Sequence, residues 1–115
     1  MKATVTWWDL SESTQTIDSL REYLRDEGVL PWESVPGLRL KFWVSDRAGN
    51  RWGAVMLWDR DDVDPAVLPP HRASELIGYP PQQRIRFDVE ATVEGRYDEP
   101  RLGGRGLALP GFIDD

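Results

Sequence analysis

His71 is the only histidine in the chain, and histidine is the side chain whose ordinary pKa lies nearest neutrality. It is therefore the natural candidate for a general acid or base, or for a hydrogen-bond donor, in a binding site. A lone histidine at the start of a helix is also typical of a surface or capping residue. The chemistry that His71 could supply is proton transfer, and both interpretations stay open.

Tryptophan is the residue type that departs most from an ordinary small domain. There are six, more than a thin core needs: Trp7, Trp8, Trp32, Trp43, Trp52 and Trp58. Each ring can bury about 150–250 Å² and also needs a partner for its indole N–H. We select Trp7, Trp43 and Trp58 as candidate walls of a ligand pocket. For each of the three, a place in the core or in a dimer interface is the alternative.

Two basic residues, Arg39 and Lys41, are predicted to lie with Trp43 on one face of a strand. If buried there, they could bind a carboxylate or a phenolate, and we take Lys41 as a candidate substrate-binding residue. The alternative is that both side chains form solvated or interfacial salt bridges.

Other types of site are poorly supported. The chain has no cysteine, which excludes disulfides, thiol nucleophiles and thiolate metal sites. The acidic run from Asp59 to Asp64 lacks the central glycine and final glutamate of a calcium loop. The glycines between Gly103 and Gly106 do not follow the pattern of a phosphate-binding loop. We therefore expect no metal and no cofactor.

Size and charge exclude further classes of protein. The chain has 115 residues, a mass of 13.2 kDa and a formal net charge of −6, which fits one domain whose field repels nucleic acid and anionic lipid. No apolar run approaches the roughly 20 residues that span a bilayer, and the first ten residues do not resemble a signal peptide. We expect a cytoplasmic protein with no nucleic-acid or membrane partner.

Hydrophobic periodicity predicts six elements. Alternation with a period of two indicates strands, and apolar residues at helical spacing that end at a glycine indicate helices. The predicted strands are residues 2–8, 38–45, 52–58 and 84–93, and the predicted helical segments are residues 17–28 and 71–77. Turn residues between 46 and 50 make the second and third strands a hairpin. Residues 30–37 are predicted to form a loop because they contain two prolines.

The order of these elements is that of an α+β, ferredoxin-like βαββαβ sandwich, with a four-stranded antiparallel sheet and both helices on one face. We assign residues 1–94 to this domain. Residues 95–115 form a glycine-rich tail that is either disordered or docked on a neighbour. Because several strands carry apolar residues on both faces, the face without helices needs a cover. A second copy, packed sheet to sheet in a homodimer, is the simplest one.

Several short motifs resemble the YdhR-like monooxygenase family, a branch of the dimeric α/β-barrel superfamily that includes antibiotic-biosynthesis monooxygenases. The similarity covers residues 3–93 and depends on the order and spacing of its parts. These are Pro36-Gly37-Leu38 followed by Lys41 and Trp43, then Gly53, His71 and Phe87-Asp88-Val89. The sequence departs from the family pattern at Ala54, where a second glycine is usual, and at Pro69-Pro70.

The resemblance implies a dimeric α/β barrel and cofactor-independent oxygenation of a small aromatic or polyketide-like molecule, in a pocket between sheet and helices. In such chemistry an electron-rich phenolate supplies the electrons, so the protein provides a dry aromatic pocket and one proton acceptor, here His71. Haem-degrading members of the superfamily use a histidine of the second helix, but the asparagine expected on their first strand is absent here. The alternative is a non-enzymatic small-molecule binder or dimeric interaction module on the same fold.

Overall fold

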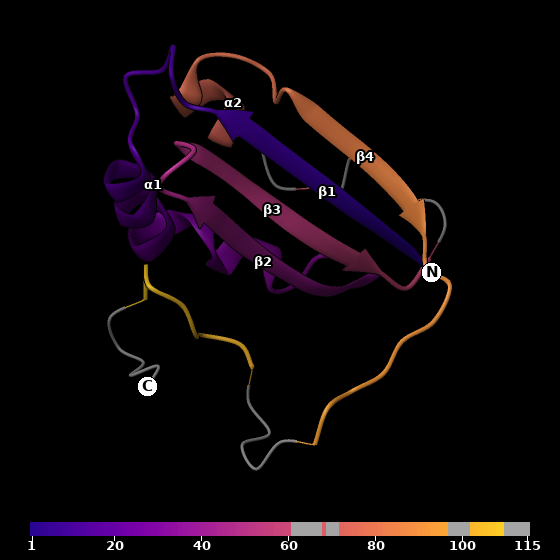
Figure 1. Cartoon of the computed structure of the whole chain (residues 1–115). Coiled ribbons are helices and arrows are strands. Elements are labelled where there is room, and N and C mark those ends of the chain that lie inside the picture. The colour runs from indigo at the N-terminus through magenta and orange to yellow at the C-terminus, as the bar shows by residue number, and fades with distance from the viewer. Residues whose placement is uncertain (61–67, 69–71, 97–101, 110–115) are drawn as a thin grey trace.

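The computed structural model describes residues 1–60, 68, 72–96 and 102–109. Its elements are β1 (Lys2–Asp9), α1 (Ile17–Tyr23), the π-helical turn η1 (Leu24–Gly28), the 3₁₀ turn η2 (Leu30–Trp32), β2 (Leu38–Asp46), β3 (Arg51–Trp58), α2 (Arg72–Ile77) and β4 (Gln83–Asp88). The strands form one antiparallel sheet in the order β2-β3-β1-β4 (Figure 1). The fold is thus α+β and compatible with the predicted ferredoxin-like arrangement.

The first helical segment begins where the sequence predicts. Thr16 caps it, because its Oγ1 accepts a hydrogen bond from the backbone N–H of Ser19 at 3.0 Å. Ser19 Oγ accepts one from the N–H of Thr16 at 2.8 Å, which completes a reciprocal capping box. The helix then continues as the π-helical turn η1 up to Gly28.

The hairpin between β2 and β3 turns over Asp46 to Arg51. Asp46 Oδ1 accepts a hydrogen bond from Gly49 N–H at 3.1 Å, and Asn50 takes a positive φ of 53°, a conformation that asparagine tolerates better than most residues. The local turn chemistry therefore closes the hairpin in the register that pairs Asp46 with Arg51.

Register fixes which residues share a face, since directly paired residues point to the same side of a sheet. One row across the sheet is Lys41, Met56, Thr4 and Arg86, and the next is Trp43, Ala54, Thr6 and Arg84. These two rows lie on the helix side. The alternating rows, which include Phe42, Val55, Val5 and Ile85, lie on the opposite face.

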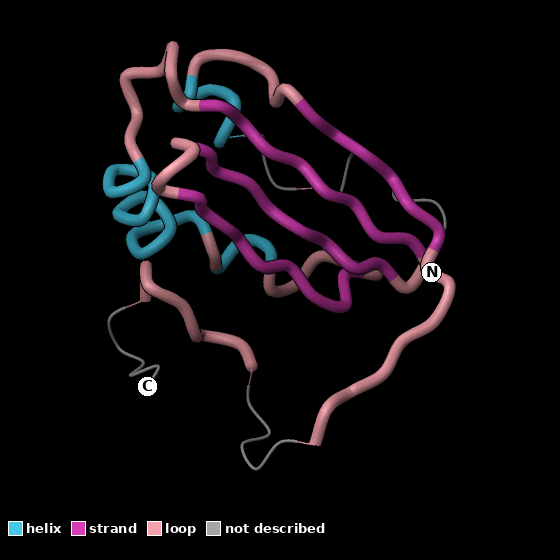
Figure 2. Tube along the Cα trace, in the orientation of Figure 1, coloured by secondary structure: helices cyan, strands magenta, loops and turns pink. Residues whose placement is uncertain are grey.

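The core sits at one end of the helix side. Trp8 of β1 and Trp52 of β3 pack there against α1, η1 and α2 through Leu20, Leu24 and Ile77. Both α-helices are short and gather near that end of the sheet (Figures 1 and 2). The remaining part of the helix-side face is therefore available for a cavity.

The fourth strand is shorter than predicted. It ends at Asp88 rather than at residue 93, because Asp88 already pairs with Lys2, the first residue of β1. The backbone N–H of Val89 still donates to Met1 O at 3.3 Å, but beyond that point β1 offers no further partner. The alternation of apolar and polar residues continues in the sequence to residue 93, but β1 offers no pairing partner that far.

Part of the tail docks on its own chain. Ala108 is buried in the core cluster, and its carbonyl accepts a hydrogen bond from Arg25 Nε at 3.3 Å. Leu102 and Leu107, by contrast, are exposed. None of the described helices is long and apolar enough to cross a membrane.

Candidate functional site

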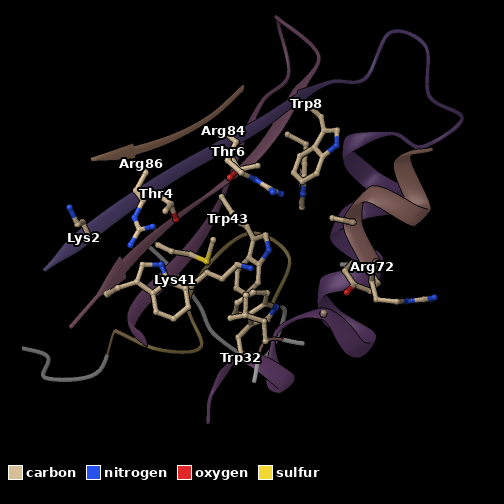
Figure 3. A pocket seen from close by; sticks show the side chains of 18 residues that line it. Lys2, Thr4, Thr6, Trp8, Trp32, Lys41, Trp43, Arg72, Arg84 and Arg86 are labelled. Carbon is tan, nitrogen blue, oxygen red and sulfur yellow. The ribbon is translucent and has the colours of Figure 1, made fainter. Parts of the chain in front are cut away.

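A cavity of about 470 Å³ lies on the helix side of the sheet, beside the core (Figure 3). Its volume is in the range typical of small-molecule sites. Five of the six tryptophans line it, and we call it the tryptophan cavity: Trp8, Trp32, Trp43, Trp52 and Trp58, with Thr4, Thr6, Lys41, Met56, Arg84 and Arg86 among the other lining residues. The cavity combines aromatic walls with a few polar groups.

Lys41 carries the most perturbed charge in the cavity. Its Nζ lies 3.2 Å from the ring centroid of Trp32 and 4.8 Å from that of Trp43, so the ammonium meets π faces that attract it. No hydrogen bond or ion pair of this amine to another described residue accompanies the two ring contacts. Burial lowers the pKa of Lys41 to about 7, because an apolar surrounding disfavours the charged form. Lys41 can thus give or take a proton near neutral pH.

The floor of the cavity contains an unpaired hydroxyl. Thr4 and Thr6 project from β1 into the cavity (Figure 3). Thr4 Oγ1 is fully buried and has no hydrogen-bond partner in the described part of the chain. A buried polar atom without a partner costs free energy, so this hydroxyl is a candidate contact for a ligand.

The described charged residues around the cavity are all basic. They are Lys2 from β1, Lys41 from β2, Arg72 from α2, and Arg84 and Arg86 from β4. Lys2 forms an ion pair with Asp88, and Arg72 forms ion pairs with Glu27 and Glu75. In a protein with a net charge of −6, this local excess of positive charge favours an anionic ligand.

The predicted site residues separate into three groups. Lys41, Trp43 and Trp58 all line the cavity. Trp7 does not, because it pairs with Gly53, which in turn pairs with Val44, in a row on the opposite face of the sheet. Arg51 lies over the Trp7 ring at 5.2 Å. The predicted acid or base, His71, lies outside the described residues.

Arg39, predicted to share a face with Lys41 and Trp43, does not line the cavity. A register irregularity between Leu38 and Leu40 interrupts the alternation there. Arg39 pairs instead with Asp59 at 3.2 Å, and both side chains are about half exposed. Of the two possibilities given for Arg39, ligand binding and a salt bridge, the structure therefore shows the salt bridge.

Three cavity features were missed in the sequence. Trp32 belongs to a segment predicted to be a loop, and the 3₁₀ turn η2 brings its ring over Lys41. Arg84 and Arg86 belong to the predicted last strand, but only the pairing with Thr6 and Thr4 places them beside the cavity. Period-two alternation groups Thr4 with Thr6 on one face of the first strand, yet it does not show which face the helices cover.

A metal centre is not visible in the part of the chain that the structure describes, since no three potential ligands among histidine, aspartate and glutamate come together there. Comparison with known proteins adds no family: no protein-family model matches the chain, and no curated protein matches it significantly. The function is therefore argued from the geometry of the tryptophan cavity.

Proposed function

We propose that the protein binds a small aromatic molecule with an acidic group in the tryptophan cavity. The walls offer ring faces on which a planar molecule can stack, and aromatic pairs contribute about 0.5–1.5 kcal/mol beyond the area that they bury. The basic residues of β2 and β4 favour a carboxylate or a phenolate at the polar end of the ligand.

The placement of Lys41 is the observation that carries this proposal. Its amine lies over Trp32 and Trp43 and is not paired with any described carboxylate. An anionic ligand would supply the missing counter-charge, and its approach would raise the pKa of Lys41 back towards the value of a free amine. Thr4 Oγ1 could donate a second hydrogen bond to the same group.

Calorimetric titration with 1-hydroxy-2-naphthoate, which carries both a phenol and a carboxylate, tests the proposal. We expect a saturable signal with one site per chain, and a dissociation constant that rises about tenfold or more in Lys41→Met, since a hydrogen bond to a charged group contributes about 1.5–3 kcal/mol. Arg47→Met is the matched control, because Arg47 is exposed in the hairpin turn and pairs with Asp18. Equal affinities for Lys41→Met and the parent protein would contradict the proposal.

A second proposal follows from the resemblance to the YdhR-like family: the bound aromatic is oxygenated by O₂ without a cofactor. An aromatic cavity beside a group that can accept a proton near pH 7 supports it. With anthrone as probe, one oxygen atom would become the new carbonyl and the other would leave as water, with all electrons supplied by the methylene carbon. His71 and Lys41 are the proposed proton acceptors.

Oxygen uptake with anthrone checks the second proposal. We expect uptake above the rate in buffer, and a rate that falls at least tenfold in Lys41→Met or His71→Ala. Binding of 1-hydroxy-2-naphthoate without any enzyme-dependent oxygen uptake would favour the non-enzymatic alternative, a small-molecule binder on the same fold.

We also propose that a second copy of the chain covers the open face of the sheet, as in a dimeric α/β barrel. Phe42 and Phe87 are each 46% exposed there, and Val44 and Ile85 are each 41% exposed. Half-buried Val5, Trp7, Val55 and Leu57 continue the same face. Soluble monomers seldom expose so continuous an apolar surface.

A further inference from the structure

We propose that Lys41 is a carbonyl-reactive amine, which condenses with an aromatic aldehyde or ketone bound in the tryptophan cavity to form an imine. This inference rests on the proposed ligand cavity and names a class of ligand for it. The reaction joins Lys41 Nζ to the carbonyl carbon, and the carbonyl oxygen leaves as water. This condensation needs no oxidant, reductant or metal.

The first support is the place of the amine. Lys41 lies on β2, and its register partner on β3 is Met56, which also lines the cavity. The Nζ atom stands over the faces of Trp32 and Trp43. A planar carbonyl compound stacked on these rings would bring its carbonyl carbon close to the amine, and such positioning of two reacting groups is a large part of catalysis.

The second support is the protonation state that the surroundings impose. Only a neutral amine has the free electron pair that attacks a carbonyl. Burial holds the pKa of Lys41 at about 7, so about half of the amine is neutral at pH 7. The tryptophan faces partly oppose burial, because they favour the ammonium.

Charged groups from the other elements also line the cavity. They are Lys2 of β1, Arg72 of α2, and Arg84 and Arg86 of β4, with the phenol of Tyr23 from α1 as a further titratable group. The four are cations, and two of them are paired with carboxylates, Lys2 with Asp88 and Arg72 with Glu27 and Glu75. The positive charge of this lining favours an acidic substituent on the carbonyl ligand.

The sequence makes the assignment unusually easy to check, since the chain contains only two lysines, Lys2 and Lys41. Lys2 sits at the start of β1, where its ammonium is bound by the carboxylate of Asp88 and not stacked on aromatic rings as Lys41 is. One lysine is thus expected to be reactive and the other serves as the reference within the same molecule.

The experiment uses 4-carboxybenzaldehyde as the probe and borohydride to reduce the imine to a stable secondary amine. After reaction at pH 7, peptide mass spectrometry measures how much adduct each lysine and the N-terminal amine carry. We expect at least ten times more adduct at Lys41 than at Lys2. Labelling of Lys41 should rise with pH through a midpoint near 7, and excess 1-hydroxy-2-naphthoate should protect it.

Equal labelling of the two lysines, or adduct at Lys2 and the N-terminus alone, would overturn the inference. Because this comparison is made within the parent protein, it does not depend on whether Lys41→Met folds. The calorimetric titration separates the two proposals. If 1-hydroxy-2-naphthoate binds but Lys41 gains no adduct, the imine proposal is wrong and the proposal of a ligand site in the tryptophan cavity is retained. If the naphthoate does not bind and Lys41 gains no adduct, both proposals are wrong.

Discussion

At the scale of single residues, two side chains of the tryptophan cavity lower the stability of the folded state. Lys41 holds an amine where burial disfavours its charge, and Thr4 holds a hydroxyl without a partner in the described part of the chain. Residues at binding sites commonly break the rules that stabilise a core. Both costs can be measured in the absence of ligand.

For Lys41 the cost depends on pH. Its pKa is about 7 in the folded chain against 10.5 for an ordinary lysine, so between these values the unfolded chain holds a proton that the folded chain has released. Raising the pH through this window therefore stabilises the folded state, by at most about 1.4 kcal/mol per pH unit.

Urea unfolding of the parent protein and of the Lys41→Met variant, each at pH 7.5 and pH 9.5, tests this expectation. The free energy of unfolding of the parent protein should rise relative to that of the variant as pH increases. A difference between the two proteins that is the same at both pH values would show that Lys41 titrates as an exposed lysine does.

Thr4→Val replaces the unpaired hydroxyl by a methyl group of similar size. Since an unsatisfied buried hydroxyl costs about 1–3 kcal/mol, we expect the ligand-free variant to be more stable by about 1 kcal/mol and to bind 1-hydroxy-2-naphthoate more weakly. Thr14→Val, at an exposed position, is the control. A clear loss of stability in Thr4→Val would mean that the hydroxyl already has a partner.

At the scale of elements, β1 and β3 approach each other closely where Trp7 faces Gly53. A Cβ atom added to Gly53 would stand 2.4 Å from the backbone oxygen of Thr6 and 2.9 Å from Cβ of Trp7. A backbone atom cannot move aside as a flexible side chain can, so the two central strands would have to separate. The cavity row of Trp43, Ala54 and Thr6 lies immediately beside this contact.

Gly53→Ala is therefore expected to destabilise the protein by about 1–3 kcal/mol, the usual range for overpacking. Gly95→Ala is the matched control, because a Cβ at Gly95 meets nothing within 4 Å. Thermal unfolding followed by circular dichroism measures both. If the midpoint of Gly53→Ala equals that of Gly95→Ala, the central pair of strands is looser than the structure shows.

The elements themselves could largely be predicted, because each follows from local patterns. Alternation marked β1, β2 and β3, and the glycine after Glu27 marked the end of the first helical segment. The end of β4 could not be predicted in the same way, since it depends on where β1 runs out of residues at Lys2. The site depended even more on non-local packing. The place of Trp32 over Lys41 follows from a 3₁₀ turn that contains Pro31, and no periodicity indicates this turn.

At the scale of the whole molecule, the two faces of the sheet have different proposed tasks. The helix side holds the tryptophan cavity, and the opposite face presents Phe42 and Phe87 to solvent. Period two in the sequence predicted that both faces would carry large apolar residues, but not which tryptophan would lie on which face. Trp7 and Trp8 are neighbours in the chain, and their rings lie on opposite faces of the sheet.

We predict that light scattering gives a mass of twice 13.2 kDa at micromolar concentration. The double variant Phe42→Glu and Phe87→Glu should give a monomer, because it places charges in an apolar interface. Val93→Glu is the control, since Val93 is 93% exposed and lies outside the sheet. A monomeric parent protein at high concentration would contradict the barrel.

The most direct test of the ligand cavity is an NMR titration of the six indole N–H groups with 1-hydroxy-2-naphthoate, assigned through single Trp→Phe variants. Five of these rings line the cavity and Trp7 lies on the other face, so Trp7 is a built-in reference. We predict saturable shifts for Trp32 and Trp43 and none for Trp7. Unchanged signals for Trp32 and Trp43, or a shift of Trp7 as large as theirs, would contradict the account.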